Sequence, residues 1–185
     1  MKTKNIIFAL ALSTLVFTGC KKDKENPENP SPSTNDSEII TTCSITFVDP
    51  TGTQPSYTAT FRDPDGDGSS APTAFDTIFL HPSTLYNASI LLLNETISPA
   101  DTISNEVLEE GDEHLFCFEI ADADVVVTRT DSDGTYEIGL LSNWLVGSAG
   151  SGNVTVTLKH QPGVKNGNCD PGDTDVEITF PIVVE

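Results

Sequence analysis

Apolar and polar residues alternate with a period of two along most of the chain beyond residue 39, the pattern of β-strands that bury one face. The alternation is clearest near the C-terminus, where apolar residues occupy every second position from Val176 to Val184. Thr and Val are frequent in these segments, and both residue types favour strands. The pattern predicts nine strands, at 43–47, 57–61, 76–80, 86–93, 114–120, 124–130, 135–142, 153–160 and 175–184.

A helical pattern is nearly absent from the same region. Only the segment 98–110 has Pro99 near its start and Ile103 and Val107 at helical spacing, which predicts one or two helical turns. Short strands joined by turns rich in Gly, Asp, Asn and Pro are typical of an antiparallel β-sandwich of immunoglobulin-like size. We therefore expect an all-β domain over residues 39–185.

The strand order predicts that the two ends of this sandwich differ in charge. Because successive antiparallel strands reverse direction, alternate loops lie at the same end. One end, named here the acidic pole, then holds most acidic residues of the domain, and His114 and His160 border it. Its loops are 63–68, 94–113, 131–134 and 161–174. The loops of the opposite end, 49–55, 81–84, 121–123 and 145–152, are short and mostly uncharged.

The N-terminus has the composition of an export signal. Two lysines precede an apolar run, 6–17, that is too short to span a bilayer. Small residues then stand before Cys20 and resemble the lipobox of bacterial lipoproteins, which implies cleavage before Cys20 and diacylation of its thiol. We expect a signal peptide at 1–19, and the lipidated Cys20 with a flexible polar tether at 20–38. An uncleaved signal anchor is the alternative.

The formal net charge of −19 limits the partners of the predicted domain. Carboxylates outnumber its basic residues several-fold, and those basic residues are Arg62, Arg129, Lys159 and Lys165. Such a field repels nucleic acid and anionic lipid headgroups, and it attracts cations or a basic protein surface. The alternative is that the acidity only keeps the protein soluble.

A calcium site is predicted in the first acidic loop. Asp63, Asp65 and Asp67 alternate before a glycine, as in the first half of a calcium-binding loop, where carboxylates surround a hard cation. The bidentate Glu of that pattern is replaced by Ala74, so Asp76 or a neighbouring loop must supply the missing oxygen. The alternative is a polar turn that binds no metal.

A transition-metal site is the second candidate at the acidic pole. It combines His114 and His160 with Glu110 and Glu113, and imidazole and carboxylate groups are ligands of zinc and iron. The alternative is structural, because each histidine is in phase with apolar residues of its strand and can bond to a loop at the sheet end.

Motifs of catalysis and of thiolate metal sites are absent from the sequence. The glycine- and serine-rich segment 147–152 has neither the spacing of a nucleophile elbow nor that of a phosphate-binding loop. Cys43, Cys117 and Cys169 remain once Cys20 is lipidated, so at most one disulfide forms within the chain, and its pairing stays open. We do not expect an enzyme.

Several of these segments together resemble a family of small lipoproteins from the Bacteroidota, especially flavobacteria. The likeness covers nearly the whole chain after Cys20 and rests chiefly on Arg62-Asp-Pro-Asp-Gly-Asp-Gly68, Leu93-Asn-Glu-Thr-Ile-Ser-Pro-Ala-Asp101, Glu109-Glu-Gly-Asp-Glu-His114 and Thr155-Val-Thr-Leu-Lys-His-Gln-Pro162. Members are catalogued as uncharacterised or as "type 1 periplasmic binding fold superfamily" proteins. That label implies two α/β lobes, for which this chain has too little helix.

The lipobox-like sequence and the lack of catalytic motifs, taken with this resemblance, lead us to expect a lipid-anchored, non-enzymatic binding or accessory module of the outer membrane, on its periplasmic face or at the cell surface. The resemblance further implies a role in nutrient or metal uptake beside a TonB-dependent receptor. Calcium or a transition metal would bind at the acidic pole. The alternative is a structural or adhesive surface domain in which calcium stiffens the loops and no ligand is transported.

Overall fold

The computed structural model describes residues 38–66 and 68–185. The predicted signal peptide, Cys20, the tether before Glu38 and Asp67 therefore lie outside the described residues. The described chain forms an all-β fold with a single short helix, as the hydrophobic pattern predicts. Its elements are β1 (Thr42–Val48), β2 (Tyr57–Arg62), β3 (Ala74–Phe75), β4 (Ile78–Leu80), β5 (Leu85–Leu93), α1 (Ile103–Glu109), β6 (His114–Ala121), β7 (Val125–Arg129), β8 (Leu141–Val146), β9 (Gly150–His160) and β10 (Asp173–Val184).

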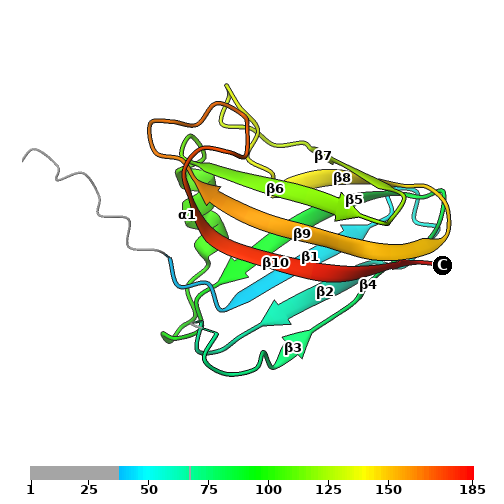
Figure 1. The fold of residues 1–185 in the computed structure, drawn as a ribbon, viewed down its shortest axis with the longest axis horizontal. Helices are drawn as coiled ribbons and strands as arrows, with labels where there is room; N and C mark the ends of the chain where they lie inside the picture. Colours follow the sequence, from blue (N-terminus) through cyan, green and yellow to red (C-terminus); the bar gives the residue numbers. More distant parts are fainter. Residues whose placement is uncertain (1–37, 67) are drawn as a thin grey trace, which may run out of the picture. The chain divides into compact units, whose positions relative to one another are not determined.

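The strands form two sheets packed face to face (Figure 1). One sheet has six strands in the order β3-β2-β1-β5-β8-β7, and the other has four in the order β4-β10-β9-β6. The predicted sandwich-like architecture is confirmed. The sheets are not purely antiparallel, however, because β4 runs parallel to β10.

Only residues 78–80 of the strand predicted at 76–80 form a strand, β4, and β3 ends at Phe75, just before the predicted segment. β3 pairs with β2, whereas β4 pairs with β10. The two residues between them are held at the edge of β2, since Asp76 N donates to Thr60 O and the Tyr57 hydroxyl donates to Thr77 O. The chain crosses from one sheet to the other immediately afterwards, which a period-two pattern alone does not reveal.

The predicted strand at 135–142 is wrong. Most of this segment is a loop, and β8 begins only at Leu141. Ile138 and Leu140 are buried, so the apolar alternation is real. Gly139 has a positive φ of 96°, however, and its N–H donates to the Asp131 carboxylate at 2.7 Å instead of to a neighbouring strand.

The predicted helix is confirmed as α1. Its residues Ile103 and Val107 are buried, and the Ser104 hydroxyl accepts a hydrogen bond of 2.6 Å from Leu92 N at the end of β5. Among the described residues, no helix has the length and apolar composition needed to cross a membrane.

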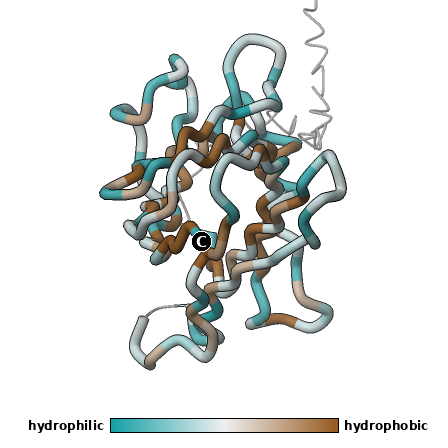
Figure 2. Tube along the Cα trace, turned by 90° about the vertical axis from the view of Figure 1, so that its right-hand side faces the viewer, coloured by the Kyte–Doolittle hydropathy of each residue, from teal (hydrophilic) through white to brown (hydrophobic). Residues whose placement is uncertain are grey.

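The core lies between the sheets and is rich in aromatic rings. Trp144 and Phe47 are fully buried and meet edge to face, with ring centroids 5.0 Å apart. Phe116 and Phe180 contribute from the four-stranded sheet. Figure 2 shows the hydrophobic positions concentrated in the interior of the fold, while the loops at its periphery are mainly hydrophilic or intermediate.

Three of the four loops of the acidic pole meet as predicted, although one of the predicted strands is wrong. Loops 94–113 and 161–172 are joined by a hydrogen bond from Gln161 N to Glu113 O. The Lys165 ammonium donates to Gly111 O and to Asp133, and so ties loop 130–140 to the other two. The misplaced strand leaves the prediction intact because β8 still runs in the expected direction.

One disulfide joins Cys117 of β6 to Cys169 of loop 161–172 across a separation of 52 residues in the sequence. Cys43 has a free thiol and is buried in β1. The structure therefore selects one of the pairings that the sequence leaves open.

Candidate functional site

Two histidines lie side by side at the acidic pole, on adjacent strands of the four-stranded sheet. His114 begins β6, His160 ends β9, and the two are register partners. Their rings are stacked, with centroids 4.8 Å apart and planes inclined by 8°. The sequence-based prediction that the two histidines share one end of the fold is therefore correct.

Asp175 of β10 completes a group of three metal-binding side chains. Donor atoms of His114, His160 and Asp175 all lie within 4.8 Å of one another. The Asp175 side chain is only 2% exposed, and its Oδ2 lies 3.9 Å from His114 Nε2. We call these three residues the His–Asp cluster.

Sequence reasoning missed Asp175 because of a backbone irregularity. Strict alternation from Val176 places Asp175 on the outer face of the sheet, together with Glu177. The register of β10 against β9 shifts between Thr174 and Val176, as at a β-bulge, and Asp175 turns inward. The only signal in the sequence was its position at the very start of the last predicted strand, beside the acidic loops.

A hydrogen bond fixes the orientation of His114. Its Nδ1 lies 3.1 Å from the carbonyl oxygen of Glu110, which can only accept, so Nδ1 carries the proton. In the neutral ring Nε2 then keeps its lone pair on the side of Asp175. Metal-binding histidines are commonly oriented in this way by a backbone carbonyl.

Burial shifts two groups of the cluster, His114 and Asp175, toward their neutral forms. Desolvation lowers the pKa of His114, and the neighbouring His160 lowers it further, against the opposing effects of Glu110 O and Asp175. Desolvation also raises the pKa of Asp175, which the two histidines only partly counteract. A buried carboxylate next to a neutral imidazole lacks a full counter-charge, and a bound cation would supply one.

The two glutamates predicted as ligands have different positions. Glu113 lies beside the cluster, with Oε2 3.5 Å from His160 Nε2. Glu110 contributes its backbone carbonyl to His114, and its side chain is outside the group of donor atoms that could hold a metal.

The predicted calcium ligands do not all point to one place in the described structure. Asp63 is buried at the turn and accepts a hydrogen bond from Gly68 N, while Asp65 Oδ2 accepts one from the Ser69 hydroxyl. Asp76 accepts a hydrogen bond from Thr60 N at the edge of β2. Because Asp67 lies outside the described residues, calcium binding at this loop stays a prediction.

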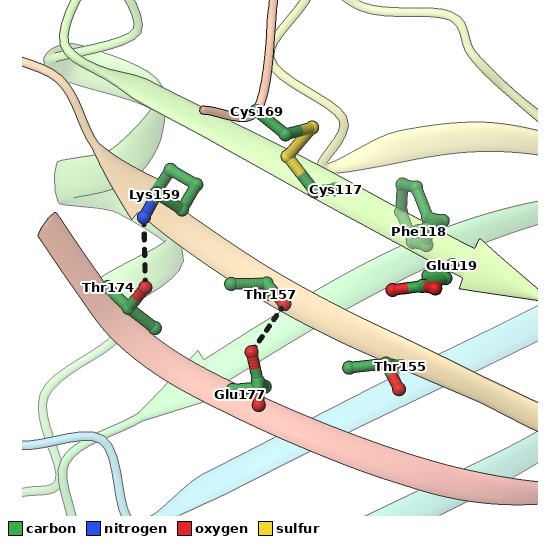
Figure 3. Close-up of a pocket in the computed structure, with 9 residues that line it drawn as sticks. All are labelled: Cys117, Phe118, Glu119, Thr155, Thr157, Lys159, Cys169, Thr174 and Glu177. Atoms are coloured by element: carbon green, nitrogen blue, oxygen red, sulfur yellow. Dashed lines mark hydrogen bonds between the residues drawn. A yellow bond between two sulfur atoms is a disulfide. The ribbon is translucent and has the colours of Figure 1, made fainter. Parts of the chain in front are cut away.

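A depression lies on the outer face of the four-stranded sheet and has a volume of about 370 Å³ (Figure 3). The disulfide forms part of its wall, and Lys159 and Glu177 are bonded to the hydroxyls of Thr174 and Thr157. Phe118 is the only aromatic residue among its lining residues and packs against the core. This surface has no stacking platform for a sugar, and two of its three charged side chains, Lys159 and Glu177, are already hydrogen-bonded.

Comparison with family models, with curated proteins and with solved structures finds no match to this chain. The function is therefore argued from the chemistry of the acidic pole.

Proposed function

We propose that this protein is a non-enzymatic cation-binding module, held at a bacterial outer membrane by a lipid on Cys20. Its acidic pole binds a divalent transition-metal ion and serves uptake of that metal beside a TonB-dependent receptor. The anchor is inferred from the lipobox-like sequence around Cys20, and the receptor from the family resemblance. The His–Asp cluster is the observation that carries the metal-binding proposal.

Three features of the cluster favour a transition metal over a purely structural role. Two imidazoles and one carboxylate are a donor set suited to zinc or iron. The sheet register, the bulge and the Glu110 carbonyl hold the donors near one another before any metal binds. The Asp175 Oδ2 atom is buried and accepts no hydrogen bond within the described structure, which is costly unless a cation or a proton occupies the space.

Metal binding requires a small closure of the cluster. Ligands of a tetrahedral zinc ion are about 3.4 Å apart at zinc–ligand distances of about 2.1 Å, against the 4.8 Å span of the three donors. With His114 held by the Glu110 carbonyl, rotation of the His160 imidazole out of the parallel stack would bring the nitrogens toward a common centre. Glu113 Oε2, 3.5 Å from His160, is placed to supply a fourth ligand.

Calorimetric titration of the full chain with zinc chloride tests this proposal. His160→Ala and Asp175→Asn should each weaken zinc binding by about tenfold or more, because each removes one ligand. His81→Ala is the matched control, since His81 lies at the opposite end and bonds to Glu185 O. Equal zinc affinity in all of these variants would reject the metal site and leave a structural or adhesive surface domain as the better explanation.

A further inference from the structure

A groove of about 420 Å³ opens beside the His–Asp cluster, between the start of the domain, β2 and β10. Its lining combines carboxyl groups with an apolar wall. The lining residues are Glu38, Ile39, Ile40, Phe61, Asp63, Gly66, Asp175, Val176, Glu177 and Ile178.

Three of the carboxyl groups in this groove are withdrawn from solvent. Asp63 is 6% exposed, and Glu38 is half-buried although the sequence assigned it to the tether. Glu38 Oε2 and Asp175 Oδ2 are both buried and accept no hydrogen bond from the described residues. Glu177 differs, because its carboxylate accepts a hydrogen bond from Thr157 on the outer face of the sheet.

No basic residue is among the described residues that line the groove. The nearest in sequence, Arg62, is bonded to Glu95 at 2.6 Å. Burial raises the pKa of Glu38 to about 7, and the negative charges of Glu106 and Asp175 and a hydrogen bond with the Glu106 side chain raise it as well. The groove thus gathers carboxyl groups with no basic residue among the described residues that line it, and a bound cation would supply the missing charge.

The apolar wall decides what kind of cation fits. Calcium and magnesium prefer to be surrounded by six or more oxygen atoms, whereas Ile40, Phe61 and Ile178 present hydrocarbon to this groove. A primary ammonium group has three donors for carboxylate oxygens, and its alkyl stem can lie along the hydrocarbon. We propose that the groove binds a primary alkylammonium group, carried by a free amine or by a lysine side chain.

This site is separate from the metal site except for Asp175, which borders both. Zinc and an alkylammonium ion should therefore compete, since each draws on the same carboxylate. Loss of one activity need not abolish the other, because the remaining ligands differ.

Titration of the full chain with butylammonium chloride, followed by NMR, tests the proposal against potassium chloride at equal ionic strength. Saturable binding of butylammonium is expected, and methylammonium should bind more weakly because it lacks the alkyl stem. Glu38→Gln and Asp63→Asn should each weaken butylammonium binding by about tenfold or more, as expected for the loss of a hydrogen bond to a charged group. If Asp63→Asn lowers the stability of the fold, Glu38→Gln still tests the proposal. Glu38 lies at the start of the domain, where a substitution should disturb folding least.

Two control variants distinguish binding in the groove from a general effect of negative charge and from metal binding at the His–Asp cluster. Asp112→Asn removes an exposed carboxylate of the same pole outside the groove and should leave butylammonium binding unchanged. His160→Ala should weaken zinc binding by about tenfold or more and leave butylammonium binding unchanged. A failure of the metal site can therefore be told apart from a failure of the ammonium site. Equal responses to butylammonium and potassium, or equal weakening by Asp112→Asn and Glu38→Gln, would overturn the proposal.

A second probe distinguishes the two sources of the amine. Nα-acetyl-lysine N-methylamide carries the same ammonium on a peptide backbone. Tighter binding of this probe than of butylammonium supports a lysine side chain of a protein as the natural occupant, and the reverse order supports a free amine.

Discussion

Removal of the Cys117–Cys169 disulfide should lower the free energy of unfolding of the domain, and the size of the loss can be calculated from the number of residues between the two cysteines. The bond closes a loop with a sequence separation of 52 residues. In the chain-entropy treatment, a loop of this size restricts the unfolded chain enough to stabilise the folded state by about 4 kcal/mol. For a domain of this length, each kcal/mol corresponds to about 2–4 °C in Tm, so the expected loss is about 8–16 °C.

Thermal unfolding of the full chain, with and without a reducing agent, measures this loss. The double variant Cys117→Ser/Cys169→Ser should melt at the temperature of the reduced wild type and should not respond to the reductant. Cys43 does not affect the difference in Tm between the oxidised and reduced protein, because its free thiol is buried and forms no disulfide. Identical melting of the oxidised and reduced wild type would refute the reasoning, because it would mean that the disulfide does not measurably restrict the unfolded chain.

Four further predictions address the acidic pole, the core, the calcium loop and the anchor. Lys165→Met should cost about 3 kcal/mol in urea unfolding, because it removes a buried ammonium that bonds to Asp133 and Gly111. Desolvation raises the pKa of Asp133, but hydrogen bonds from Tyr136 N, Lys165 and Thr135 N outweigh it and lower the pKa to about 2. This stabilisation is therefore present above the ordinary value of 3.8 and lost as the pH falls toward 2, and Asp133→Asn should remove that part of the acid transition. Trp144→Ala should cost about 3–5 kcal/mol by the same urea assay, since the side chain is fully buried among aromatic rings; a loss below 1 kcal/mol would contradict the described core. Millimolar calcium should raise the Tm of the wild type, and Asp65→Ala should abolish the rise if the loop binds calcium; an unchanged melting curve at low ionic strength would leave only a polar turn. Cys20→Ser should eliminate incorporation of labelled palmitate and release the protein from the membrane fraction, and unaltered labelling would exclude Cys20 as the lipidation site.

The sequence by itself determined the fold class and the gathering of the acidic loops. Alternating apolar residues can bury one face only as strands, and short strands with reversing turns leave little choice but two stacked sheets. The side on which each loop lies depends only on the number of reversals before it. That is why His114 and His160 were correctly assigned to one end even though the strand at 135–142 was misplaced.

Tertiary structure alone decided where alternation breaks and which residues meet. Gly139 leaves the extended conformation to bond with Asp131, and the chain changes sheets after Thr77, so two apparently regular segments become a loop and a crossover. The bulge at Asp175 also arises from tertiary structure. It is an extra residue in the pairing of β10 with β9, and the local sequence of β10 does not predict it. The third member of the His–Asp cluster therefore comes from strand pairing between distant parts of the chain, and a pattern read along one strand contains no information about its neighbour's register.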